Sequence, residues 1–121
     1  MKKNNCYKYP KTQREKIEGK RHYVFDQEKL PSVTTILDAT QSAEKRESLA
    51  KWREKMGEDN AARIVDESAA RGTAMHKILE KYVLGEGYLD ETSVGKQAHN
   101  MALQVIQSGL NNVTEYYGTE C

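Results

Sequence analysis

The chain lacks any apolar run long enough to cross a membrane, since a spanning helix needs about 20 predominantly apolar residues. It also lacks the apolar stretch that follows the basic start of a secretory signal peptide. We therefore expect no membrane partner and no signal peptide. These two absences favour a cytoplasmic protein.

Cysteine is scarce as well, because only Cys6 and Cys121 are present and they lie near opposite ends of the sequence. Their separation matches neither the ligand spacing of a metal site nor a disulfide framework. We expect two free thiols in a reducing compartment.

Large apolar residues are few, with one Phe and one Trp among 121 residues, and charged residues make up 31% of the chain. This composition is polar but not extreme enough for full disorder. A chain of this length forms one small domain with a modest core. We interpret residues 1–19 as a basic N-terminal arm and residues 20–121 as the folded part.

The positive charge is concentrated at the start of the chain. Residues 1–30 contain nine Lys and Arg against four Asp and Glu, although the net charge of the whole protein is only +1. A basic arm on a mildly acidic body is typical of a protein that binds a polyanion such as nucleic acid. A solvated, poorly ordered terminus would have the same composition.

Apolar periodicity predicts a mainly helical α+β chain. Residues 20–26 favour a short strand, and Ser32 is a natural N-cap for a helix over residues 33–37, although the β-branched run there suits a strand equally. Further helices are predicted over residues 43–56, 59–68, 69–84 and 92–108. Residues 113–117 could start a strand, for which we expect no partner in the chain.

One constellation could carry chemistry. Gly72, His76 and Glu80 follow one another at four-residue intervals, so a helix places them on one face. Imidazole and carboxylate groups are both competent ligands for a divalent ion. The same spacing is also found in packed histidines and in surface ion pairs without any metal.

Three sequence blocks give this pattern a context: LPSVTTIL at residues 30–37, LAKWREKMG at 49–57 and AARGTAMHKILEKY at 69–82. Their order and spacing resemble the N-terminal half of RecB-type exonucleases of the PD-(D/E)XK superfamily. The chain is most similar to phage exonucleases and to the mitochondrial genome maintenance exonuclease. The resemblance covers residues 20–84 well and residues 85–121 loosely.

The resemblance implies a metal-dependent DNA exonuclease of DNA recombination or repair, which hydrolyses phosphodiester bonds with Mg²⁺ or Mn²⁺. In that family the Gly-Thr-x-x-His pattern supplies a metal ligand, which implies this role for His76 and a less direct one for Glu80. The complete family fold is α/β and restriction-endonuclease-like. DNA is the implied partner, single-stranded DNA being one candidate form, and a phage-encoded protein would act in the host cytoplasm.

The sequence departs from the family after this helix. The family continues with an Asp on a β-hairpin and then an (Asp/Glu)-x-Lys triplet. Here the only such triplet begins at Glu18, and the only Asp after His76 is Asp90. Glu115 or Glu120 could match an acid ahead of the hairpin, but neither has an assigned role. We expect the chain to be an incomplete nuclease domain that is inactive alone.

Several residues are candidates for DNA contact. Hydroxyl groups at the start of the predicted helix 33–37 suit a phosphate, basic residues flank Trp52, and Tyr7, Tyr9 and Tyr23 lie near cations, as in surfaces for single-stranded DNA. An ordinary helix cap and a solvated helix face explain the first two sets equally well. The predicted DNA-binding residues are Ser32, Thr34, Thr35, Lys51, Arg53, Arg71 and Gly72.

Two other functions stay open. The chain could be a non-catalytic module that binds DNA or a protein partner, or a small interaction protein whose resemblance is accidental. The exonuclease hypothesis predicts that the reading frame continues into the missing acids and lysine. The binding-module hypothesis predicts salt-sensitive DNA binding without cleavage. The interaction-protein hypothesis predicts neither DNA binding nor metal binding.

Overall fold

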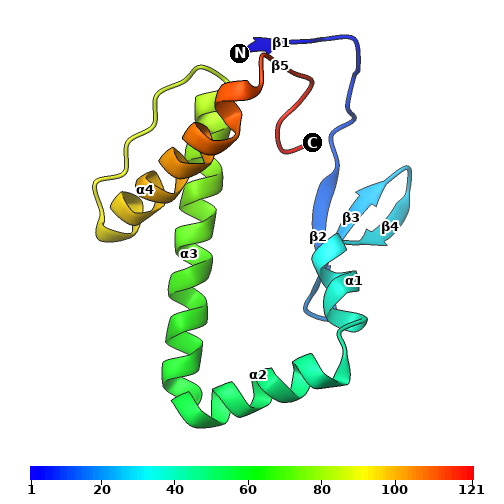
Figure 1. The fold of residues 1–121 in the computed structure, drawn as a ribbon. Helices are drawn as coiled ribbons and strands as arrows, with labels where there is room; N and C mark the ends of the chain where they lie inside the picture. Colours follow the sequence, from blue (N-terminus) through cyan, green and yellow to red (C-terminus); the bar gives the residue numbers. More distant parts are fainter. The chain divides into compact units, whose positions relative to one another are not determined.

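The computed structural model describes residues 1–121 as an α+β chain that is mainly helical (Figure 1). None of its helices combines the length and the hydropathy needed to cross a bilayer. The elements in chain order are β1 (Lys2–Lys3), β2 (Gln13–Ile17), β3 (Lys20–Phe25), β4 (Glu28–Pro31), α1 (Val33–Ala39), α2 (Ala43–Met56), α3 (Glu58–Val83), α4 (Ser93–Ser108), a 3-10 turn η1 (Leu110–Asn112) and β5 (Glu115–Tyr116).

The chain forms two compact units. The first comprises Met1–Tyr9 and Asp59–Glu120, and the second comprises Pro10–Glu58. The first contains most of α3 together with α4 and the pair β1 and β5, whereas the second contains the sheet β2–β3–β4 with α1 and α2.

The core of the first unit lies between α3 and α4. Ile78 of α3 packs with Ala98 and Ala102 of α4, which are 0% and 1% exposed. Half-buried apolar side chains surround this contact. These are Ala74, Met75, Leu79 and Tyr88.

Long α3 differs from the prediction of two helices over residues 59–68 and 69–84. No proline interrupts residues 58–83, so the hydrogen-bond ladder continues through the predicted break. Gly72 lies inside the helix and is tolerated, because a helical glycine costs only about 1 kcal/mol relative to alanine. The helix ends at Val83, and Gly85 turns the chain away with a φ of 74°, which glycine adopts easily.

The two ends of the chain meet in the first unit. Strand β1 pairs with β5 in parallel, so that Lys2 lies opposite Glu115 and Lys3 opposite Tyr116 (Figure 1). The expectation that a strand in residues 113–117 has no partner is therefore wrong. The partner comes from the N-terminal residues, which carry no periodicity that would reveal a strand.

The sheet of the second unit is antiparallel with the order β2–β3–β4. Glu18 and Gly19 turn the chain between β2 and β3, and Asp26 and Gln27 turn it between β3 and β4, all with positive φ. The predicted strand over residues 20–26 corresponds to β3, and β2 lies inside the segment interpreted as an arm. Pro31 ends β4, an edge strand, where its missing N–H is tolerated.

Helix starts in this unit follow the sequence closely. Ser32 caps α1 by accepting a hydrogen bond from the Thr35 N–H, and Ser42 caps α2 through the Lys45 N–H. The helical interpretation of residues 33–37 is confirmed, and α1 continues to Ala39. Helix α2 has the predicted bounds and ends at Gly57, with a φ of 82°.

Candidate functional site

His76 and Glu80 lie one turn apart on α3 and line the same groove of the first unit. Ile78, between them in sequence, turns inward to the contact with α4, and the helical period therefore directs His76 outward. The His76 side chain is 69% exposed, so the imidazole is open to solvent and to a ligand.

The C-terminal residues complete this groove. The Thr119 hydroxyl donates a hydrogen bond to Glu80 Oε1 over 3.4 Å, and Glu120 Oε1 lies 3.9 Å from His76 Nδ1. The first contact orients the Glu80 carboxylate. The second is longer than a hydrogen bond and becomes an ion pair only when the imidazole is protonated.

The groove is open and has a volume of about 250 Å³. Its polar groups lie beside apolar side chains from α3, α4 and η1. The lining residues are His76, Leu79, Glu80, Val83, Val105, Leu110, Thr119 and Glu120.

The chemistry of these donors fits a divalent ion of the Mg²⁺ or Mn²⁺ type in kind but not in number. Imidazole nitrogen and carboxylate oxygen are ligands for Mn²⁺, and the oxygens also suit Mg²⁺. However, nowhere in residues 1–121 do three His, Cys, Asp or Glu side chains form a group that could hold a metal ion. The groove therefore offers suitable donor atoms but no complete ligand set for such an ion.

Lys81, which follows Glu80 in sequence, is paired with an acid outside the groove. Lys81 forms an ion pair with Glu86, and the hydrogen bond to that carboxylate, followed by its charge, raises the pKa of Lys81. Lys81 is therefore held by its neighbour beyond the end of α3. Glu80 is left with Thr119 as its hydrogen-bond donor.

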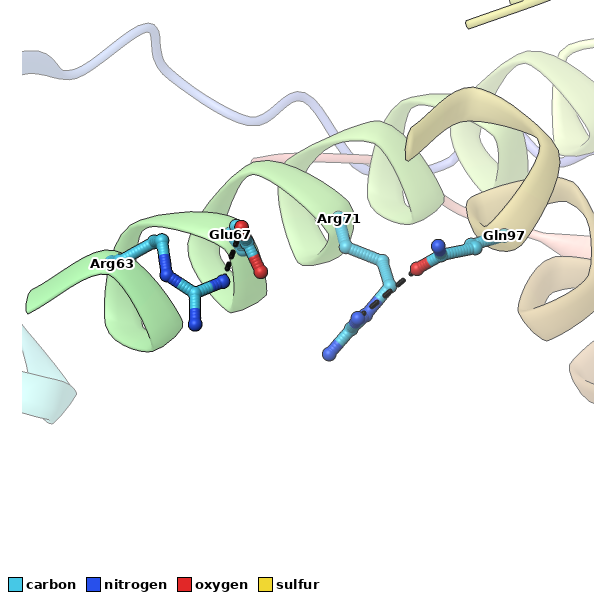
Figure 2. A network of polar contacts seen from close by, with 4 residues as sticks. All are labelled: Arg63, Glu67, Arg71 and Gln97. Atoms are coloured by element: carbon cyan, nitrogen blue, oxygen red, sulfur yellow. Dashed lines mark hydrogen bonds and ion pairs between the residues drawn. The ribbon is translucent and has the colours of Figure 1, made fainter. Parts of the chain in front are cut away.

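Arg71 and Gly72 precede His76 on α3. Arg71 donates from Nη1 to Gln97 Oε1 of α4 over 3.1 Å, while about two turns earlier Arg63 pairs with Glu67 (Figure 2). An amide partner leaves the Arg71 charge uncompensated, so the guanidinium retains its attraction for an anion. A Cβ built on Gly72 would meet no atom within 4 Å, so the space above this glycine is open.

Three predicted DNA-binding residues start α1 in the second unit. Ser32 is only 6% exposed, and its Oγ lies within hydrogen-bond distance of the hydroxyls of both Thr34 and Thr35. Thr35 also donates to the Arg21 carbonyl of β3. These hydroxyls thus form a cap that fixes α1 to the sheet, and their contact with phosphate stays a prediction.

Lys51 and Arg53 lie on the exposed surface of α2. Lys51 forms an ion pair with Glu47 at 3.2 Å, which reduces its availability to a phosphate. Arg53 lines an open hollow near the end of α2 with Ala50, Glu54, Gly57 and Glu58. The two residues belong to a different unit from His76, and their predicted DNA contact is not tested by this structure.

Sequence reasoning missed Thr119 and gave Glu120 no role. Both lie about forty positions after the histidine helix, in a segment with no motif of its own. Only the return of the chain beside α3 brings them to the groove. A scan against models of protein families, a search of curated proteins and a search of solved structures each gave no match to this chain.

Proposed function

We propose that this chain is the N-terminal part of a Mg²⁺- or Mn²⁺-dependent DNA exonuclease that hydrolyses phosphodiester bonds. Its complete fold would be the α/β fold of restriction-endonuclease-like nucleases, with α3 as the helix that presents the histidine. Two lines of support meet at His76: the resemblance of residues 20–84 to that family, and the position of the side chain on an open groove beside two carboxylates.

The single observation that carries the proposal is the grouping of His76, Glu80 and Glu120 around one groove. A histidine that serves only packing would be expected to be buried, and the His76 side chain is 69% exposed. A simple surface ion pair would not need two acids from distant parts of the chain. The arrangement agrees better with a partly built ligand set.

Each residue has a task in this proposal. His76 would hold the ion through a neutral ring nitrogen, and Glu80 would offer a carboxylate oxygen whose direction Thr119 helps to fix. Arg71 and the open backbone at Gly72 would receive the DNA phosphate. When bound, the ion would lower the pKa of a water molecule and neutralise charge on the phosphate. The remaining acids and the lysine would come from residues beyond position 121.

The first experiment is to read the coding DNA past codon 121. The proposal predicts that an Asp and an (Asp/Glu)-x-Lys follow in the same frame. A genuine stop codon, together with salt-sensitive DNA binding and no cleavage, would instead establish a non-catalytic DNA-binding module.

The second experiment uses the completed protein with end-labelled DNA and Mn²⁺. His76→Ala should abolish cleavage or slow it by at least about a hundredfold, because it removes a proposed metal ligand. His22→Ala is the matched control, since His22 lies on β3 in the second unit and its Nδ1 is 3.0 Å from the backbone carbonyl of Lys20. Equal cleavage by the two variants would refute the role of His76.

A further inference from the structure

Three exposed tyrosines from opposite ends of the chain gather in the first unit. The ring centroid of Tyr7 lies 5.4 Å from that of Tyr117 and 6.4 Å from that of Tyr9, with tilted ring planes. Tyr7 is 62% exposed, Tyr9 is 50% exposed and Tyr117 is 42% exposed. The rings therefore touch one another while much of their surface remains open to solvent.

Backbone pairing, rather than burial, holds these rings together. The parallel pair β1 and β5 fixes the N-terminal residues beside residues 115–116, and the Asn4 N–H donates to the Tyr116 carbonyl over 2.7 Å. The Asn4 side chain donates to Glu115 and accepts from the Cys6 N–H, which turns the chain toward Tyr7. A fixed group of exposed aromatic rings is typical of an interaction surface.

The N-terminal segment that carries Tyr7 and Tyr9 is cationic. Residues 1–9 contain Lys2, Lys3 and Lys8 and no acidic residue, and all three lysines are exposed. None of these lysines forms an ion pair. Glu115, which lies opposite Lys2, is the nearby acid, and its carboxylate accepts the hydrogen bond from Asn4.

We propose that Tyr7, Tyr9 and Tyr117 form a stacking surface for the bases of single-stranded DNA, with the lysines of residues 1–9 contacting its phosphates. Unpaired bases expose their faces to aromatic side chains, whereas a duplex hides them, so this chemistry selects single strands. The choice of DNA rests on the proposed nuclease function. The sequence suggested Tyr23 as the third ring, but Tyr23 belongs to the second unit on β3, and Tyr117 takes its place.

The test measures binding of a fluorescein-labelled oligothymidylate to the 121-residue chain by fluorescence anisotropy. Tyr7→Ala should weaken binding by about tenfold, which is the scale of losing one base–aromatic stack. Tyr7→Phe should stay within about twofold, because the ring is retained. The control is Tyr82→Ala, which removes another exposed tyrosine, 43% exposed, from the end of α3. A loss in Tyr7→Ala no greater than in Tyr82→Ala, or no binding by the unchanged chain, would overturn the proposal.

A second measurement protects the test against a variant that fails to fold. Oligothymidylate carrying 5-iododeoxyuridine forms photochemical crosslinks with stacked aromatic residues, and peptide mapping locates them. We expect crosslinks at Tyr7, Tyr9 or Tyr117 in the unchanged chain, and a crosslink map confined to other residues would contradict the surface. Duplex DNA of the same length should compete at least about tenfold less well.

Binding and cleavage can fail separately. If the completed protein cleaves DNA but the tyrosine variants bind normally, the stacking surface is wrong and the nuclease function stands. If the tyrosines bind single strands but the reading frame ends at codon 121, the surface stands and the nuclease function fails.

Discussion

The hydroxyl of Thr119 lies 3.4 Å from the Glu80 carboxylate, although 39 positions separate the two residues in sequence. This contact and the neighbouring approach of Glu120 to His76 join the C-terminal segment to the last two turns of α3. The two candidate metal ligands of α3, His76 and Glu80, therefore have a second carboxylate, that of Glu120, and the Thr119 hydroxyl beside them. Four predictions follow from this groove and from the helices around it.

Mn²⁺ added to the 121-residue chain should broaden NMR resonances first at His76, Glu80 and Glu120, because the ion is paramagnetic and these donors share one groove. His76→Ala should remove this local effect. His99 is the internal control, since its Nε2 already accepts the Asp90 N–H. Broadening of equal strength at both histidines would indicate unspecific binding and contradict the site.

Gly72→Ala should stabilise the chain by about 1 kcal/mol, because alanine is the better helix former and its Cβ would meet no atom within 4 Å. The proposed nuclease function further predicts that the same methyl group slows DNA cleavage by about tenfold in the full-length protein, because it displaces a phosphate from α3. Chemical denaturation and cleavage assays measure the two effects. A stabilised variant with full activity would show that DNA does not approach this glycine.

Gly95→Ala should have the opposite effect on stability. A Cβ at this position would lie 2.2 Å from Asp90 Cγ and 2.4 Å from the Asp90 carbonyl oxygen, so the loop before α4 would have to move. We expect a loss of about 1–3 kcal/mol by chemical denaturation, as for other overpacked sites. Gly87→Ala is the control, because its Cβ would meet nothing within 4 Å. Equal stability of the two variants would contradict the close approach.

Protonation of Asp90 at low pH should reduce the stability of the first turn of α4. Hydrogen bonds from the hydroxyl and N–H of Thr92 lower the pKa of the Asp90 carboxyl, and Thr92 in turn caps α4 by accepting the Gly95 N–H. Because the folded pKa is the lower one, this stabilisation is present above the unfolded pKa of about 3.9 and is lost as pH falls through the folded value.

Hydrogen exchange of the first turn of α4, measured between pH 6 and pH 3, would test this linkage. Thr92→Val should reduce the acid-dependent loss of protection, because it removes the hydroxyl that stabilises the charged carboxylate and keeps only the backbone N–H donor. Thr92→Ser keeps a hydroxyl and should preserve the loss. Identical pH profiles in the two variants would show that Asp90 does not control the helix start.

Local sequence determined most of the helices and their caps. Ser32 and Ser42 were predictable as caps because a serine hydroxyl can satisfy a free N–H within its own turn. The bounds of α2 follow from Ser42 at its start and Gly57 at its end, and the helical period places Gly72, His76 and Glu80 on one face. The α+β, mainly helical class could be predicted from the same short-range patterns.

The tertiary structure decided what distant residues do together. Lys2 and Lys3 lie in a segment without a strand pattern, yet they pair with β5, since backbone hydrogen bonds need no particular side chains. The same pairing brings Tyr117 against Tyr7. The residues that follow β5 return to α3, where Thr119 contacts Glu80 and Glu120 approaches His76. Sequence alone determined which residue types could bind metal or DNA. Their grouping required the long-range return of the chain, which no local periodicity encodes.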